Sequence, residues 1–337
     1  MSAFDTADAV ARFGRALVSV DTTAATGLVG ELLEHGADPV VVLVEVIAAG
    51  QRAVGMHWQR GEWTVAREHA ATGVSAAAVE VVAGYARRVP VSRGRVVVAC
   101  AEREWHALPA SLVGHALRAH GWEVTLLGAS TPAARLSQYL HDLGPDATAV
   151  SCSVLGALPA SRRFVEATTA AGIPVLAGGS GFGQDDRRAL AIGATAWAPG
   201  AYAAVEAIAA LPPVVPAAPP LPAAAVAEQA QLERAHPRLL AGLRAGWSFA
   251  ASVLTGSPAV ADSLESVVKD VLDQSLHAVW AALLTGDPRP IPETAAWVAE
   301  LLAARGADPR LVDELGELLT SVLVDFPLSH ALMTEAR

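Results

Sequence analysis

The chain has 337 residues, 53% of them hydrophobic, and a formal net charge of −10. Such a length holds two or three domains, and an acidic chain is a poor partner for nucleic acid, whose phosphates are bound by clustered Lys and Arg. No run of 18 or more apolar residues appears without a charge, Gly or Pro, so we expect no membrane span, and the N-terminus lacks the apolar segment of a secretion signal. We therefore expect a cytoplasmic protein that binds neither a membrane nor nucleic acid directly.

Residues 1–88 read as helices throughout. Apolar residues recur at helical spacing, as at Val41, Val44 and Ala48. Asp38-Pro39 combines a cap residue with a proline suited to the first helical position, and Gly61-Glu62 interrupts the pattern before a further helix. We predict a bundle of four helices over this segment.

Residues 93–211 change to short β-branched runs that alternate with helices. This alternation with short connections predicts a doubly wound parallel sheet of five strands, in which ligands bind beyond the carboxyl ends of the strands. The expected strands span residues 95–101, 123–128, 147–153, 173–179 and 194–199. The expected helices span residues 108–120, 132–141, 160–171, 184–192 and 201–210.

Residues 212–222 read PPVVPAAPPLP, with six prolines in eleven positions, which is typical of a semi-rigid linker. Residues 223–337 return to helical spacing, as in the apolar stripe of Leu264, Val268 and Val271. Five or six helices fit this length and suit a globin-like or bundle fold. The predicted fold class is therefore α/β plus all-α.

The loop after the first predicted strand contains an acid two residues before a histidine, Glu104 and His106. Imidazole is a natural ligand of transition metals, and a metal-bound histidine usually donates its other ring proton to a carboxylate. Glu104 is placed to accept that proton. The same spacing also occurs in ordinary solvated loops, so it is weak evidence by itself.

Over residues 93–211 the chain resembles the cobalamin-binding domain of methionine synthases, methylmalonyl mutases and light-sensing repressors. The motif of that family is acid-x-His-x-x-Gly, then Ser-x-Leu, then Gly-Gly. The chain departs from it at Pro109, where Gly is usual, and at Ser153, where Leu is usual. The matching segments are Glu104-x-His106-x-x-Pro109, the Leu-Gly-x-x-Thr-Pro run of 127–132, Ser151-Cys152-Ser153 and Gly178-Gly179.

The resemblance implies that cobalamin binds with its dimethylbenzimidazole tail detached from cobalt and with His106 in its place. His106 is thus the predicted cobalt ligand. Small residues at the strand ends would let the flat tail enter between the sheet and a helix. The other cofactor-binding residues predicted in this domain are Glu104, Thr131, Ser151, Ser153, Gly178 and Gly179.

A second pattern lies in the helical segment, where Trp58 is followed, after nine residues, by Glu68-His69. It resembles the light-sensing cobalamin repressors of the carotenoid-operon type. The resemblance implies that Trp58 covers the upper face of cobalamin and that Glu68 accepts from the ribose of a 5′-deoxyadenosyl group, with His69 in the same site. Those repressors have a histidine directly after the tryptophan, where this chain has Gln59, so the cobalt ligand after photolysis stays open. A core tryptophan and a solvated acid–histidine pair form the alternative interpretation.

In the C-terminal segment, Asp273, His277 and Trp280 share a helix face, which a polar flank of an amphipathic helix also explains. A cobalamin sensor followed by a globin-like domain resembles photocobilins, which add a bilin chromophore. The resemblance implies a biliverdin site in residues 223–337 that includes His277, with haem as the rival cofactor and His277 as its axial ligand. Because Cys100 and Cys152 both precede the linker, a bilin here cannot be held by a thioether.

These resemblances imply a photoreceptor rather than an enzyme. It would bind adenosylcobalamin and a bilin, and it would signal to a downstream protein through a light-driven rearrangement of its domains. The alternative is a corrinoid methyl carrier for a methyltransferase, and a third interpretation is the cobalamin subunit of an isomerase. The sequence does not identify the downstream partner, and it is compatible with a homo-oligomer.

Overall fold

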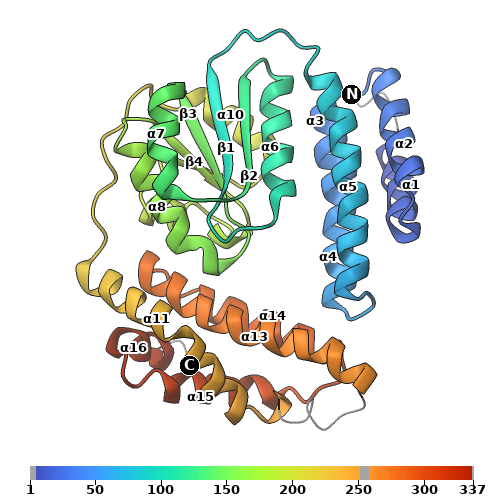
Figure 1. The fold of residues 1–337 in the computed structure, drawn as a ribbon. Coiled ribbons are helices and arrows are strands. Elements are labelled where there is room, and N and C mark those ends of the chain that lie inside the picture. The colour runs from blue at the N-terminus through green and yellow to red at the C-terminus, as the bar shows by residue number, and fades with distance from the viewer. Residues whose placement is uncertain (1–4, 251–257, 336–337) are drawn as a thin grey trace. The chain divides into compact units, whose positions relative to one another are not determined.

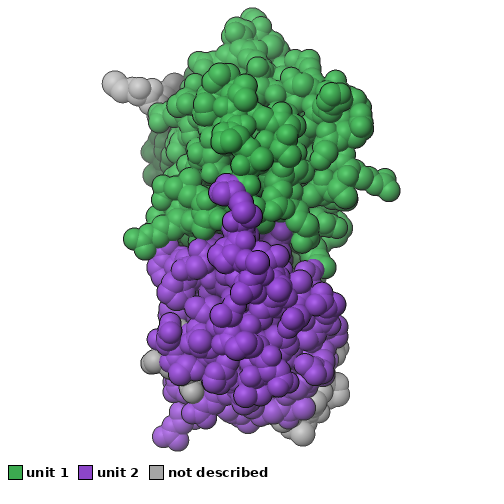
Figure 2. Space-filling model, turned by 90° about the vertical axis from the view of Figure 1, so that its left-hand side faces the viewer, with its two compact units in different colours: residues 1–153, 160–218 green, residues 154–159, 219–337 purple. Residues whose placement is uncertain are grey.

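The computed structural model describes residues 5–250 and 258–335. The chain divides into two compact units, which Figure 2 colours separately. Unit 1 comprises residues 1–153 and 160–218, and unit 2 comprises residues 154–159 and 219–337. The N-terminal helices and the α/β sheet therefore belong to one unit, and a short segment after the third strand belongs to the other.

The N-terminal part of unit 1 is the predicted four-helix bundle (Figure 1). Its third helix runs without a break from α3 through the π-helical segment η1 into α4. Each helix begins where an Asp or Thr side chain accepts from the first free amides, at Asp5, Asp21, Asp38 and Thr64. The bounds are α1 Thr6–Ser19, α2 Thr22–Glu34, α3 Pro39–Val41, η1 Val42–Ala48, α4 Ala49–Gln59 and α5 Val65–Ala86.

Apolar side chains fill the interior of the bundle. Phe13, Leu43 and Ile47 are fully buried, and Gly50 permits the close approach of Phe13, because a Cβ at Gly50 would lie 2.6 Å from its ring. The helical run Pro39–Gln59 is long and apolar enough to cross a membrane by length and composition alone. Its buried residues in η1 belong to the bundle core, which accounts for the apolar composition.

The second part of unit 1 is the predicted five-stranded parallel sheet, and its strands follow the order β2-β1-β3-β4-β5. Helix α6 contacts α5 of the bundle and α10 of the α/β domain, so the two parts share one hydrophobic core. The strands are β1 Arg95–Ala101, β2 Glu123–Thr131, β3 Ala147–Ser151, β4 Val175–Gly178 and β5 Ala196–Ala198. The helices are α6 Ala107–Ala119, α7 Ala133–Leu143, η2 Leu155–Ala157, α8 Leu158–Thr169, η3 Ser180–Phe182, α9 Arg187–Ala191 and α10 Ala201–Ala210.

Strand ends differ from the predicted ones at the edge where a ligand would bind. Strands β3 and β4 end at Ser151 and Gly178, because the chain then turns and the Cys152 carbonyl accepts from the Gly181 amide over 3.0 Å. Strand β2 continues beyond the predicted residue 128, because Thr131 still pairs with Ala101 of β1. The alternation of apolar residues in the sequence predicts neither the early ends of β3 and β4 nor the extension of β2.

The Pro-rich segment is partly attached to the α/β domain. The Val215 amide donates to the Gly172 carbonyl over 3.0 Å, and the Ala218 amide donates to Thr169 Oγ1 over 2.9 Å. The linker therefore runs along unit 1 as far as residue 218 before unit 2 begins.

Unit 2 is all-α within its described residues. Trp247 and Trp280 are buried in its interior, and η2 packs against α13. Helices α13, α14 and α16 each begin at a proline, a residue suited to the first helical position. The helices are α11 Ala223–Gly246, α13 Pro258–Thr285, α14 Pro290–Ala303, α15 Arg310–Val322 and α16 Pro327–Glu335.

Gly179, directly after β4, offers a test of this sheet edge. Its φ of 105° and ψ of 160° belong to a region reserved for glycine, and a Cβ there would overlap the Cys152 backbone. We expect Gly179→Ala to lower the free energy of unfolding by about 1–3 kcal/mol, measured by urea denaturation with circular dichroism. Gly200→Ala is the matched control, because its φ of −178° suits any residue and no atom lies within 4 Å of the added Cβ. Equal losses for both variants would contradict the account.

Candidate functional site

The loop from β1 to α6 lies at the carboxyl edge of the sheet. Arg103 and Ser130 both have positive φ, 72° and 48°, and the Arg103 amide donates to Ser130 Oγ over 3.1 Å. The Ser130 amide donates in turn to the Glu104 carbonyl over 2.8 Å. These bonds compensate for two strained residues and fix the loop against the end of β2.

Glu104 is fully buried and accepts three hydrogen bonds. Its Oε1 accepts from the His106 amide over 2.8 Å and from His106 Nδ1 over 2.6 Å. Its Oε2 accepts from the Ser153 amide. One carboxylate therefore joins the loops that follow two neighbouring strands, β1 and β3, and it orients the imidazole as the sequence predicted.

These hydrogen bonds shift the pKa values of Glu104 and His106. Burial alone would raise the pKa of Glu104, but the hydrogen bonds from His106 and from the Ser153 amide outweigh burial and hold that pKa below its usual value. The hydrogen bond to Glu104 raises the pKa of His106, against the effect of burial and with help from the charge of Glu68. With Nδ1 bonded to Glu104 and 62% of the side chain exposed, Nε2 is the atom left for a metal.

A cavity of about 650 Å³, here called the bundle cavity, lies between α5 and the loop that carries His106. His106 and the exposed Trp105 line it from the sheet, and Glu68, His69 and Thr72 line it from α5. Thr72 Oγ1 donates to Glu68 Oε1 over 3.0 Å and accepts from Gln51 Nε2 over 2.7 Å. The Glu68 carboxylate, which Thr72 of the same helix holds in place, thus lines the same cavity as the His106 imidazole.

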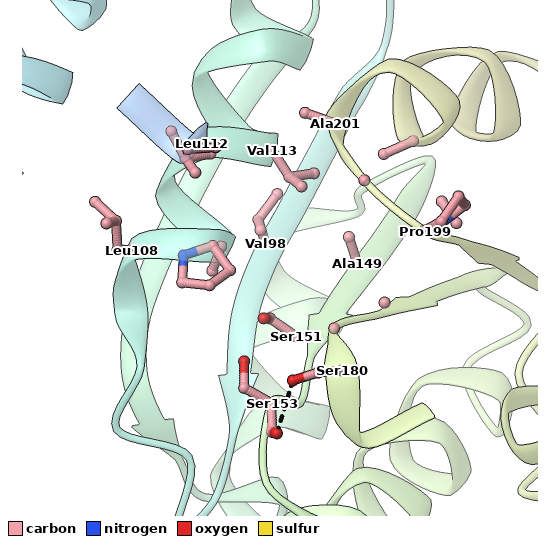
Figure 3. A pocket seen from close by; sticks show the side chains of 18 of the residues that line it. Val98, Leu108, Leu112, Val113, Ala149, Ser151, Ser153, Ser180, Pro199 and Ala201 are labelled. Atoms are coloured by element: carbon pink, nitrogen blue, oxygen red, sulfur yellow. Dashed lines mark hydrogen bonds between the residues drawn. The ribbon is translucent and has the colours of Figure 1, made fainter. Parts of the chain in front are cut away.

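A second cavity of about 390 Å³, here called the sheet cavity, lies between α6, the strand ends and α10. Figure 3 shows Ser151, Ser153 and Ser180 gathered at one end, where Ser180 Oγ donates to the Ser153 carbonyl over 2.9 Å. The rest of the lining is mostly apolar and includes Val98, Leu108, Leu112, Val113, Ala149, Leu176 and Ala201.

The two cavities adjoin, because Gln51, Leu108, Pro109 and Ser153 line both of them. The residue types fit cobalamin: an imidazole with one free nitrogen faces the larger cavity, and a narrow apolar cavity with hydroxyls begins beside it. Gly178 also leaves room there, because a Cβ on it would approach the Ala198 carbonyl to 3.0 Å. The predicted residues Ser151, Ser153, Gly178 and Gly179 all line the sheet cavity.

Trp58 lies in the last turn of α4 and is half-buried. The described residues that line the bundle cavity do not include Trp58 or Gln59. The neighbouring His57 stacks on Trp63, with ring centroids 4.8 Å apart, and its Nδ1 bonds to Glu62. The structure therefore places Glu68 and His69, but not Trp58, on the cavity wall.

Thr131 is the last residue of β2 and pairs with Ala101. It is not among the described residues that line either cavity. His277 lies in unit 2, on α13, and is described below. Sequence reasoning did not identify Gln51, Thr72 or Ser180. The spacing of four residues between Glu68 and Thr72 on one helix was the available signal for Thr72.

Comparisons with known proteins agree with this geometry. Residues 9–83 and residues 94–208 each match a family described as B12 binding domain. No curated protein matches the chain. Among solved structures, the monomethylamine corrinoid protein of Methanosarcina barkeri is 18% identical with a TM-score of 0.53, over 60% of this chain and 98% of that one. At this identity the likeness shows a shared fold.

Two further solved structures match with lower TM-scores. The methanol:cobalamin methyltransferase complex of Methanosarcina barkeri is 19% identical, with a TM-score of 0.32, over 61% of this chain and 82% of that one. A cobalamin-binding protein from Desulfitobacterium hafniense is 21% identical, with a TM-score of 0.33, over 60% of this chain and 96% of that one. The two matched domains and the imidazole-bearing cavity together identify the chain as a cobalamin-binding protein.

Proposed function

We propose that this chain is a photoreceptor that binds adenosylcobalamin, with His106 as the cobalt ligand and with the nucleotide tail in the sheet cavity. The observation that supports it is the bundle cavity, where the Glu68 carboxylate on α5 and the His106 imidazole line one space. When bound, adenosylcobalamin supplies a cobalt–carbon bond that visible light breaks.

Glu104 prepares His106 for this role. Its carboxylate accepts a hydrogen bond from Nδ1–H of His106, which favours the tautomer with a free Nε2. The hydrogen bond from the Ser153 amide holds the carboxylate in place. The exposed Trp105 lines the same cavity and offers an aromatic surface beside the imidazole.

Glu68 is the proposed acceptor for the ribose hydroxyls of the adenosyl group. Its side chain is 25% exposed and is held by the Thr72 hydroxyl, which is itself bonded to Gln51. A carboxylate that accepts from hydroxyls forms strong, charge-assisted bonds. A methyl group has no hydroxyl to offer this carboxylate, so Glu68 supports the adenosyl form. The role of Trp58 above the cofactor stays a prediction.

Signalling would follow from loss of the group that fills the bundle cavity. Helix α5 bears Glu68 and also contacts α6, which begins directly after His106. Removing a ligand that bonds to one wall changes the balance between two arrangements of bundle and sheet. In this proposal the chain is a signalling protein rather than an enzyme, and a downstream protein detects the rearrangement.

The second candidate is a corrinoid methyl carrier for a methyltransferase. It is favoured by the fold shared with the monomethylamine corrinoid protein, of which 98% is covered. The two functions differ in the cofactor that the dark protein prefers and in whether light changes the protein.

We also propose that unit 2 binds a bilin without a covalent bond, with haem as the rival. An apolar cavity of about 340 Å³ among α13, α14, α15 and α16 supports a buried ligand, although it must widen for a whole tetrapyrrole. Its described lining residues do not include His277, which lies elsewhere on α13.

The cobalt ligand can be tested by substitution of His106. We expect His106→Ala to retain weak cobalamin binding but to lose the absorption signature of imidazole-ligated cobalt, because His106 is the imidazole that the Glu104 carboxylate orients in the bundle cavity. Glu104→Gln should weaken cofactor binding about 10–100-fold by removing the carboxylate partner. His120→Ala, at the other end of α6, is the control. A wild-type spectrum from His106→Ala would refute the assignment.

Cofactor choice can be tested at Glu68. Loss of a hydrogen bond to a charged group costs about 1.5–3 kcal/mol, so Glu68→Ala should weaken adenosylcobalamin binding about 10–100-fold. Methylcobalamin binding should change little. Titrations in the dark with both cofactors measure this difference. An equal loss for the two cofactors would indicate packing damage and would favour the methyl-carrier function.

The second chromophore can be tested in the full chain co-expressed with a biliverdin source. We expect a coloured native protein whose pigment leaves on denaturation, because residues 223–337 contain no cysteine. Zinc-stained denaturing electrophoresis checks for a covalent band, which would contradict the proposal. A native preparation without bilin absorbance would also contradict it, and a Soret band would indicate haem instead.

A further inference from the structure

Unit 2 brings together two histidines and an aspartate that the cobalamin site does not use. His236 lies on α11, and Asp273 and His277 lie one turn apart on α13. His236 Nε2 lies 2.8 Å from Asp273 Oδ1, and one ligand atom from each of the three residues falls within 4.8 Å of the others. Helices α11 and α13 of one unit therefore bring two imidazole nitrogens and one carboxylate oxygen close together.

These nitrogen and oxygen donors suit a divalent metal of intermediate softness, such as zinc. Zinc takes imidazole nitrogen and carboxylate oxygen at about 2.0–2.2 Å in tetrahedral sites, where neighbouring ligand atoms are about 3.3 Å apart. His236 and Asp273 are already closer than this, and a ligand atom of His277 lies within 4.8 Å of both. Three protein ligands leave the fourth position to water, as in open zinc sites.

Packing holds the rings in place before any metal arrives. The His236 and His277 rings are parallel within 3°, with centroids 5.2 Å apart, and both lie edge-on to Trp280. Gly156 of η2 lies against His277, because a Cβ there would come within 2.6 Å of the ring. A side chain at residue 156 would therefore displace His277.

The surroundings favour a cation that can enter from solvent. His236 and Asp273 are partly buried, with 18% and 21% of their side chains exposed. His236 Nδ1 is buried and has no hydrogen-bond partner among the described residues. Asp270 and Asp273 outnumber the nearby Lys269. Carboxylates therefore lie at the site, and one ligand ring keeps a nitrogen without a partner among the described residues.

We propose that His236, Asp273 and His277 form a binding site for a divalent transition metal ion of the zinc class, held in position by Gly156 and Trp280. The site depends on neither cobalamin nor the photoreceptor function. It gives unit 2 a metal site of its own, beside Gly156 of η2.

The test uses the full chain loaded with cobalamin, stripped with a chelator and titrated with zinc chloride, with zinc counted by plasma mass spectrometry after gel filtration. We expect one zinc ion per chain. Asp273→Asn and His277→Gln should each weaken zinc binding at least about 10-fold. Gly156→Ala should weaken it without removing any ligand. His330→Gln, in α16 of the same unit, is the matched control and should bind like wild type.

Thermal unfolding separates a lost ligand from a lost fold. Zinc should raise the melting temperature of the wild type and of His330→Gln but not that of Asp273→Asn, which keeps the shape of the side chain. No zinc retained by the wild type, or wild-type zinc binding by Asp273→Asn and His277→Gln, would overturn the proposal. In that case His236 and Asp273 form only a structural hydrogen bond.

Discussion

The buried carboxylate of Glu104 joins the two loops on which the cofactor site depends. It accepts from the His106 amide and ring on one side and from the Ser153 amide on the other. It thereby ties the β1 loop, which contains the positive-φ residue Arg103, to the loop that follows β3. A charged group at 0% exposure is costly unless every lone pair is bonded. That requirement makes the geometry around His106 rigid.

The same carboxylate lies at the junction of the two cavities, because Ser153 lines both. A ligand that spans them must pass the loop that Glu104 holds. The sheet supplies the imidazole and a narrow cavity for a tail, and the bundle supplies a polar wall around Glu68. In the proposed photoreceptor, cofactor binding and light sensing therefore depend on different elements of one unit, the strand ends and α5.

Much of this could be predicted from the sequence. The parallel sheet, the bundle, and the pairing of Glu104 with His106 follow from alternation, helical spacing and a short local motif. The contact of Glu104 with Ser153 could not, because the residues are 49 positions apart. The pairing of His236 with Asp273, across 37 positions, was missed for the same reason. Trp58 was assigned by resemblance alone, and helical spacing does not determine which cavity a side chain faces.

The most direct test of the photoreceptor function is hydrogen–deuterium exchange of the adenosylcobalamin-loaded chain in the dark and after green light, with hydroxocobalamin-loaded chain as control. The account predicts that light increases exchange in residues 64–80 of α5 and in the loop 101–106, because the group that Glu68 holds is lost. Hydroxocobalamin-loaded protein should show no light response. Identical exchange in the dark and in the light, with the cofactor photolysed, would contradict the account and leave a cobalamin carrier.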